Sequence, residues 1–410
     1  MIRDKGFYRA LAALAIPAAF QSLVNILMAT ADNLMVSRVD ARGLAFTAVL
    51  QSGGVVNLAL AALTGLSAGS VVLVSQYWGI KDYRRIREAG AASLAICALA
   101  AVLLIGLVNL FPRAILGIVI RSDQEEAISY AMRYLPLASL SFLPYAVTAA
   151  LTGLMRGVQV ARVTIYAGAV SLISKVGLSY LLVFGGAGFQ GMGVPGAALA
   201  TLLSRLLEMA AVILFCLKGQ RTLPLGRGFV RAQAAWAWRD FARYAMPVGL
   251  TDMQWSVIGI VKLAIIGQLG STMTNAAGVS ETLMNLATLV PFALAGGAAV
   301  LVGKAVGSGD VALARSYSRT LQALFLGLGL TVAALAFLLR GPFIGMHAMT
   351  PEAASLASRM IVLGSITLIG TGYHASCFMG ILRGAGDSRF VMLVDLICGW
   401  LIVIPSAALA

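Results

Sequence analysis

A stripe of polar side chains interrupts the first long apolar segment of the sequence, and its members could bind and release a cation. Gln21, Asn25, Met28 and Asp32 are spaced by four, three and four residues, so on a helix they fall within roughly 60° of one another. A carboxylate at mid-depth in a membrane costs about 2.5–3.5 kcal/mol and almost always faces a cavity or a bundle interior. Asp32 is therefore a candidate ligand for a coupling ion or a substrate. The alternative is a structural ion pair between helices.

A lysine in a later apolar segment could meet this carboxylate. Ser171, Lys175 and Ser179 recur every four residues, which places them on one helical face. A buried ammonium beside Asp32 would favour the charged carboxylate, whereas burial alone would favour the protonated acid. We expect Lys175 to point into the same bundle as Asp32, which argues against Asp32 as a simple proton carrier.

The second half of the chain has its own polar side chains within apolar segments. Lys262 shares a helical face with Thr251 and Trp255, and Glu281 shares one with Asn285. We expect Lys262 and Glu281 to form a buried pair, either as structural neutralisation or as part of a binding cavity. His374 could change its charge near neutral pH, and the alternative is a hydrogen-bonded helix contact.

The remaining polar residues do not indicate an enzyme. Arg205 and Glu208 are three residues apart and predict a local ion pair. There is no glycine-rich phosphate loop, no His/Cys/carboxylate cluster with ligand spacing, and no Ser-His-Asp arrangement. We therefore expect no catalytic residues, no cofactor and no metal centre, apart from a proton or a sodium ion near Asp32. The lack of a Walker motif removes ATP as the energy source within this chain.

Composition identifies the surroundings of these segments as lipid. Hydrophobic residues make up 60% of the 410 positions and charged residues only 11%, where soluble domains have about 25% charged residues. The net charge of +14 would suit a nucleic-acid partner. However, the basic residues come in short clusters between apolar spans, as in the loops of a membrane protein. We therefore expect lipid and small organic molecules as partners, and no nucleic acid.

Hydropathy and length predict eleven membrane helices. A positive-inside distribution places the N-terminus in the cytoplasm, because most of the 30 Lys and Arg residues then lie in cytoplasmic connections. The predicted spans are 9–37, 45–77, 91–111, 129–152, 162–184, 193–217, 240–268, 278–302, 318–339, 357–380 and 389–410.

An internal repeat organises these helices. The segment from Thr152 to Arg162 recurs from Met379 to Arg389, with coinciding glycines and arginines. At nearly the same offset, three further kinds of match align: Pro17 with Pro247, Asn57 with Asn285, and Val74, Gly79 and Asp82 with Val302, Gly307 and Asp310. The offset spans six helices, an even number, so the halves should be related by a pseudo-two-fold axis along the membrane normal.

The repeat predicts the fold: an all-α polytopic membrane protein built from two homologous six-helix bundles, with a cavity between them. We expect an N-terminal bundle at 1–217, a basic cytoplasmic linker at 218–239 and a C-terminal bundle at 240–410. By the same arithmetic twelve helices are expected and about eleven are present. The partner of span 193–217 is missing, as if the chain were truncated. Lys262 falls at the repeat-equivalent position of Asp32.

These residues carry a resemblance to a known family. Leu382-Arg383-Gly384-Ala385-Gly386-Asp387, its partner segment at Arg156, and Pro17 followed by Asn25 and Asp32 resemble the multidrug and toxic compound extrusion (MATE) family. The resemblance covers essentially the whole chain. It implies efflux by rocker-switch alternating access, driven by a proton or sodium gradient, with Asp32 similar in position to a proton-linked aspartate. In the family's fifth helix an amide and an acid are usual where Lys175 and Ser179 stand here, which weakens a sodium site.

Three functions remain open from the sequence. The leading prediction is an ion-coupled multidrug exporter of amphipathic, mostly cationic organic compounds, acting as a monomer in the inner (plasma) membrane. A flippase for a lipid-linked precursor would need extra helices and a basic cavity, and Lys175 and Lys262 hint at the latter. A membrane-embedded enzyme would need polar residues at the membrane interface rather than at mid-depth. The expected cavity residues are Gln21, Asn25, Asp32, Asn57, Lys175, Ser179, Lys262, Glu281, Asn285 and His374.

Overall fold

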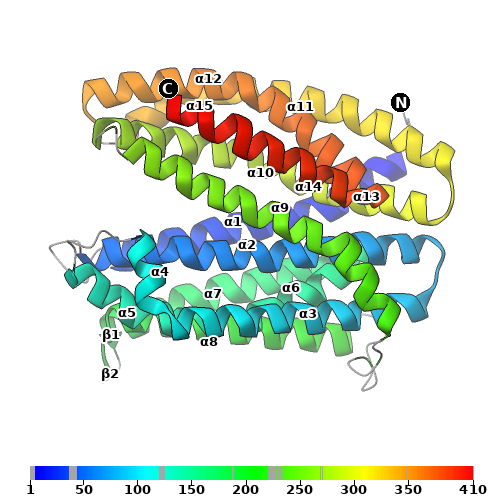
Figure 1. Ribbon diagram of the computed structural model, residues 1–410, viewed down its shortest axis with the longest axis horizontal. Helices are drawn as coiled ribbons and strands as arrows, with labels where there is room; N and C mark the ends of the chain where they lie inside the picture. The colour runs from blue at the N-terminus through cyan, green and yellow to red at the C-terminus, as the bar shows by residue number, and fades with distance from the viewer. Residues whose placement is uncertain are drawn as a thin grey trace. The chain divides into compact units, whose positions relative to one another are not determined.

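Nearly all described residues of the computed structural model lie in helices (Figure 1). The structure describes residues 5–36, 44–119, 125–186, 189–219, 229, 232, 234–267, 269, 271–347 and 349–409. Helices predominate because lipid offers the backbone no hydrogen-bond partner, so each spanning segment must satisfy its own N–H and C=O groups.

Packing groups the described residues into two compact units. The N-terminal unit takes its members from residues 20–74 and 83–253, and the C-terminal unit takes them from residues 1–19, 75–82 and 254–410. Three helices contribute residues to both units: α1 (Lys5–Val36), α2 (Leu44–Gly79) and α9 (Ala235–Gly267). The predicted bundle boundaries remain a prediction, and the predicted linker 218–239 lies mostly outside the described residues.

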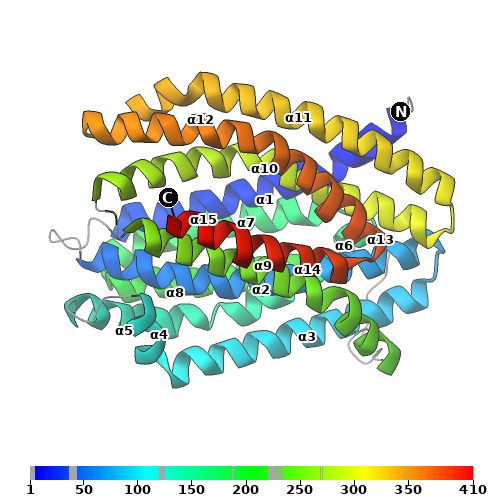
Figure 2. The same ribbon diagram turned by 45° about the horizontal axis from the view of Figure 1, so that its top comes forward.

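The N-terminal unit is built around an apolar core that includes Leu63, Leu135 and Phe142. Helices α7 and α8 run side by side in it (Figures 1 and 2). Its further elements are α3 (Tyr83–Leu110), α4 (Pro112–Val119), α5 (Glu125–Ser139), α6 (Phe142–Gly157), α7 (Arg162–Phe184), the antiparallel strands β1 (Gly185–Gly186) and β2 (Phe189–Gln190), α8 (Val194–Leu214) and the π-helical segment η1 (Phe215–Gly219).

The predicted span 129–152 is a broken helix. Helices α5 and α6 meet at a bend of 41°. Pro144 in the first turn of α6 has no N–H to donate to the carbonyl of Leu140, and Pro136 lies inside α5. Ser139 Oγ donates to the carbonyl of Pro136 at 2.6 Å. A side-chain hydroxyl thus gives this backbone carbonyl a hydrogen-bond donor beside the break.

The C-terminal unit is a second group of long helices, in which α11 and α12 lie side by side (Figures 1 and 2). Two of its helices change to π geometry within their length. Besides the parts of α1, α2 and α9 that belong to it, its elements are α10 (Ser271–Gly307), α11 (Val311–Gly345), α12 (Pro351–His374), η2 (Ala375–Leu382), α13 (Arg383–Ala385), α14 (Ser388–Ile397), η3 (Cys398–Val403) and α15 (Ile404–Leu409).

The turns of the two halves share an unusual backbone conformation that follows the repeat. Lys81 and Gly309 connect the second and third helices of each half, and both have positive φ, 58° and 77°. Gln159 (64°) and Gly386 (96°) do the same after the fourth helix. Each pair is separated by the offset that the sequence repeat predicts, so the repeat extends to backbone geometry.

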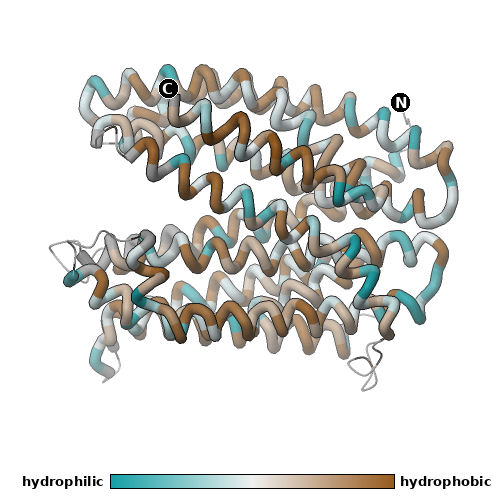
Figure 3. The backbone as a smooth tube through the Cα atoms, in the orientation of Figure 1, coloured by the Kyte–Doolittle hydropathy of each residue, from teal (hydrophilic) through white to brown (hydrophobic). Residues whose placement is uncertain are grey.

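Many helices are long and apolar enough to cross a membrane. Among the described residues nine helices meet this criterion, and the bent pair α5–α6 would make a tenth. Helix α9 is not among them and carries Asp252 and Lys262. Large apolar side chains such as Leu103, Ile173 and Leu401 are exposed on the helices, and Figure 3 shows hydrophobic residues predominating along the helix shafts. These surfaces fit a lipid environment, as the sequence predicts.

Candidate functional site

The N-terminal unit contains an ion pair between Asp32 of α1 and Lys175 of α7. Lys175 Nζ lies 2.8 Å from Asp32 Oδ1, and the two side chains are 1% and 14% exposed for lysine and aspartate, respectively. Lys175 Nζ also donates to the carbonyl of Ala197 at 3.2 Å and to Thr201 Oγ1 of α8. The ammonium is therefore surrounded by a carboxylate, a carbonyl and a hydroxyl oxygen.

One face of α7 carries the residues that surround this pair. Ser171, Lys175 and Ser179 are all buried on that face, as their four-residue spacing predicts. Ser179 Oγ donates to Asp32 Oδ1 at 3.4 Å. Gly168, just before Ser171, lets α1 approach closely, because a Cβ there would lie 3.1 Å from Gln21 Oε1. This contact places the start of the polar stripe of α1 against α7.

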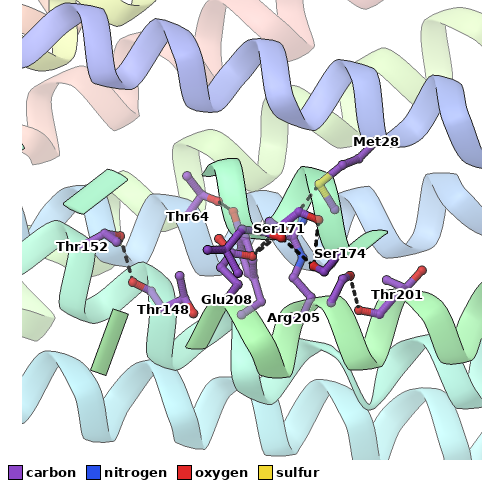
Figure 4. A network of polar contacts seen from close by, with 12 residues as sticks. Met28, Thr64, Thr148, Thr152, Ser171, Ser174, Thr201, Arg205 and Glu208 are labelled. Atoms are coloured by element: carbon purple, nitrogen blue, oxygen red, sulfur yellow. Dashed lines mark hydrogen bonds and ion pairs between the residues drawn. The ribbon is translucent and has the colours of Figure 1, made fainter. Parts of the chain in front are cut away.

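A second buried ion pair lies one helical turn further along the same interface. Arg205 Nη1 lies 2.7 Å from Glu208 Oε2, and Ser171 Oγ donates to the same oxygen at 2.9 Å. Figure 4 shows Ser171 and Arg205 converging on Glu208. The Arg205 guanidinium also packs over the ring of Tyr145 at 4.7 Å, a cation–π geometry. The sequence predicts the local pair, but not its links to α6 and α7.

The C-terminal unit contains two further pairs. Lys262 Nζ lies 3.4 Å from Glu281 Oε1, with both side chains more than a third exposed, at 37% and 41%. The pair expected from the sequence is present, but it is less enclosed than a buried pair. His374 Nε2 lies 3.2 Å from Asp395 Oδ1.

The amides expected in the cavity differ in burial. Asn25, Asn57 and Asn285 have exposed side chains, whereas Gln21 is half-buried near Gly168. A carboxylate that the sequence reading missed is Asp252 of α9, whose side chain lies beside Gly65 of α2. The signal that could have found it is the one used for Asp32: an acidic residue within an apolar segment.

Similarity to known proteins agrees with the repeat. The MatE family model matches residues 17–181 and 247–409. The chain belongs to the MatE family. The two matched segments begin at Pro17 and Pro247, the prolines that the repeat aligns, so the MatE signature occurs once in each half. The chain is therefore a multi-pass membrane protein with an internal repeat.

Curated relatives of this MatE chain are named as transporters. "Probable multidrug resistance protein NorM" of Rhizobium meliloti is 26% identical over 400 residues, covering 96% of this chain and 84% of that protein. The NorM protein of Idiomarina loihiensis is 27% identical over 406 residues, covering 97% and 85%. A crystal structure of MATE in complex with MaL6 has the same fold, with a TM-score of 0.85 at 17% identity, over 98% of this chain and 88% of that one.

Proposed function

We propose that this protein is a proton-coupled exporter of amphipathic organic compounds, with the Asp32–Lys175 pair as its coupling site. Membership of the MatE family and the names of the NorM relatives support export of this substrate class. The observation that carries the coupling proposal is the buried ion pair in the N-terminal unit, because ionisable residues inside a membrane protein are costly and mark ion or substrate pathways.

The surroundings of Lys175 favour a proton over sodium as the coupling ion. The three oxygens near its ammonium, from Asp32, Ala197 and Thr201, are the hard donors that a metal cation such as sodium would use. A lysine ammonium already fills that position. A sodium ion would have to displace it against an intact ion pair, whereas a proton needs only an oxygen of the carboxylate.

The proposed mechanism changes the charge of the N-terminal unit. When Asp32 is ionised, it neutralises Lys175. When a proton binds to Asp32, the carboxylate becomes a neutral acid, Lys175 keeps its charge, and the unit gains one positive charge. That charge repels a cationic substrate and weakens the bond between α1 and α7. Proton entry from outside thus favours substrate release there, as alternating access requires.

Glu281 has a related role in the C-terminal unit. It neutralises Lys262 across 3.4 Å, so its protonation would also leave an uncompensated lysine. Because this pair is well exposed, its charges interact in a more polar environment and respond less strongly than a buried pair. We assign the main coupling step to Asp32 for this reason.

The alternative of a lipid-linked precursor flippase loses its main support. That function would need extra helices and a basic cavity, and Lys175 and Lys262 hint only at the cavity. Each of the two lysines instead lies beside a carboxylate. The pairing favours substrates that do not require a strongly basic site.

Transport into inverted vesicles tests the proposal. Uptake of a fluorescent cation should follow an imposed proton gradient and not an imposed sodium gradient. Asp32→Asn should abolish coupled uptake. Lys175→Asn should retain transport with an altered pH dependence, because the carboxylate loses its fixed cation. Glu125→Gln, a change at the exposed start of α5, serves as the control. Normal transport by Asp32→Asn at every pH would disprove the mechanism.

A further inference from the structure

His374 and Asp395 form a polar site in the C-terminal unit that is separate from the Lys262–Glu281 pair. His374 closes α12 and Asp395 lies in α14. The carboxylate is almost fully buried, at 2% exposure, whereas the imidazole is 34% exposed. The ring of His374 stacks on Phe378 with centroids 4.7 Å apart. The buried carboxylate of Asp395 is thus bonded to a partly exposed imidazole, and stacking on Phe378 fixes the orientation of that ring.

The buried acid has hydrogen-bonding capacity that its neighbours do not use. Asp395 Oδ2 is buried and has no partner among the described residues, and the same holds for Gln254 Nε2 of α9. The Gln254 nitrogen lies 3.5 Å from the Cβ position of Gly399, which is one helical turn after Asp395. The pair therefore has an unused acceptor of its own, and an unused donor lies beside the residue one helical turn further along. Buried polar atoms without partners are uncommon and call for an explanation.

Both helices change their backbone geometry next to this site. The π segment η2 begins at Ala375, immediately after His374, and η3 begins at Cys398, three residues after Asp395. Single π turns inside α-helices are rare and are frequent at functional sites. The His374–Asp395 bond therefore joins two helices close to the point at which each departs from regular α-helical hydrogen bonding.

We propose that His374 and Asp395 form a second proton-binding site, independent of Asp32. An ionised carboxylate only accepts hydrogen bonds, so Nε2 of a neutral His374 must carry the hydrogen shared with Asp395 Oδ1. The free lone pair is then on Nδ1. A proton taken from water binds to Nδ1, so a neutral ring bonded to a carboxylate becomes an imidazolium–carboxylate ion pair, and the net charge of the pair changes from −1 to 0. Histidine is the side chain whose charge ordinarily changes between pH 5 and 8.

Other ionisable groups lie on the helices around the pair. Among the described residues, Asp395 is the carboxylate within ion-pair distance of His374. On α10, Glu281 pairs with Lys262 of α9. Two weakly acidic groups lie near His374 in sequence, Tyr373 on α12 and Cys377 on η2, and Gln322 Nε2 donates to Cys377 Sγ at 3.9 Å. The remaining charged residues of these helices are Arg239, Asp240, Arg243 and Asp252 on α9, Lys304 on α10, Arg315, Arg319 and Arg340 on α11, Glu352 and Arg359 on α12, Arg383 on α13 and Arg389 on α14.

Histidine spectroscopy tests this site directly, because the chain has only two histidines. His347→Gln removes the exposed one, which lies just after α11, and leaves His374 as the single reporter. In protein labelled with ¹³C-histidine and placed in lipid nanodiscs, the ring signals should change between pH 5 and 8. Asp395→Asn should move that titration, because it removes the partner's charge. Asp32→Asn should leave it in place.

The outcomes separate this inference from the proposed function, on which it rests only for assigning the bound proton to transport. If His374 does not titrate in this pH range in the His347→Gln protein, or if Asp395→Asn leaves the titration unmoved, there is no proton site of this kind. The titration of His374 in the His347→Gln protein is measured without the Asp395 variant, so this test does not depend on that variant's folding. If His374 titrates but Asp32→Asn transports normally, the site stands and the Asp32 mechanism fails. In vesicles, His374→Gln should lose the part of the pH dependence of transport that lies between pH 5 and 8.

Discussion

At the scale of single residues, the two lysine pairs differ in how much their surroundings contribute. Lys175 and Asp32 are enclosed, and Lys262 and Glu281 are open. Removing one partner of a buried pair leaves an uncompensated charge and costs about 3–5 kcal/mol. An exposed pair contributes about 0–1 kcal/mol. A lysine–carboxylate pair should therefore contribute much more to the free energy of unfolding in the N-terminal unit than in the C-terminal unit.

A double-mutant cycle measures this difference. Lys175→Gln and Asp32→Asn should each lower the free energy of unfolding in detergent by about 3 kcal/mol, because each leaves one charge buried without its partner. The double variant should recover much of that loss, since neither charge remains. Simple additivity of the two losses would show that the residues do not act as a pair.

The second lysine pair provides the control for this cycle. Glu281→Gln should change the free energy of unfolding by less than about 1 kcal/mol, because Lys262 remains accessible to solvent or headgroups. A loss as large as that of Asp32→Asn would mean that the exposed pair is enclosed in the working protein.

Much of this chemistry was predictable at the residue scale, but its connections were not. A carboxylate and a lysine in apolar segments indicate partners because an unpaired charge there is so costly. The pairing of Glu208 with Ser171 depends on the lateral offset between α7 and α8, which no local pattern encodes. Asn25 belongs to the same stripe as Asp32 yet is exposed, because the spacing of a stripe predicts a helical face but not the neighbour that covers each position.

At the scale of elements, α2 and α9 approach closely through small residues. A Cβ on Gly65 would lie 2.7 Å from the Cα of Gly249. In contrast, a Cβ on Gly54, earlier in α2, would meet nothing within 4 Å. Close helix packing at small residues replaces the hydrophobic driving force that lipid does not provide.

Two alanine substitutions in α2 test this contact. Gly65→Ala should destabilise the protein by about 1–3 kcal/mol, because the helices must separate. Gly54→Ala should be neutral or stabilise it by up to about 1 kcal/mol, because alanine favours the helix. Thermal unfolding of both variants in the same detergent provides the comparison, and equal effects would refute a specific contact at Gly65.

The repeated turns allow a reciprocal exchange. Lys81 has φ of 58°, and its counterpart Gly309 has φ of 77° with open space around its Cβ position. The left-handed conformation costs a side-chain-bearing residue about 1–2 kcal/mol. Lys81→Gly should therefore stabilise the protein by about 1 kcal/mol, and Gly309→Lys should destabilise it by a similar amount. Shifts of the unfolding midpoint in the same direction for both would contradict this account.

Helix positions were largely predictable, whereas helix interruptions were not. Long apolar segments specify a helix because the bilayer leaves few alternatives. Pro136 and Pro144 are a sequence signal for the break between α5 and α6. A hydropathy average over the whole segment does not detect single prolines, so it predicts one continuous span. The π segments η2 and η3 have no comparable signal, since one extra residue in a turn barely changes the pattern of apolar side chains.

At the scale of the whole molecule, the repeat and the compact units describe different properties. The repeat reflects how the sequence was duplicated, and the units reflect which residues pack together. Residues 5–19 of α1 pack in the unit that contains α10, although they open the other half of the sequence. Such grouping depends on contacts between segments distant in sequence, which a repeat offset does not encode.

Membrane orientation is a property of the entire chain and can be tested with single cysteines. In a variant lacking Cys97, Cys216, Cys377 and Cys398, cysteines placed at Gln159 or Ser308 should react with an impermeant thiol reagent only after permeabilisation. Cysteines at Gln190 or Met346 should react in intact cells. This result follows from a cytoplasmic N-terminus and the positive-inside distribution. The reverse labelling pattern would mean that the chain has the opposite orientation in the membrane, and the proposed direction of transport would then be wrong.

The contact between α1 and α10 has a consequence for biosynthesis. Leu11 and Leu14 pack against Gly297 in the C-terminal unit. A ribosome that adds about 5–20 residues per second reaches position 297 roughly 15–60 s after position 11. During that interval the first segment to enter the bilayer has no partner for its N-terminal part, and lipid or the insertion machinery must cover the surface that Gly297 later occupies. The earliest segment made is thus among the last to complete its packing.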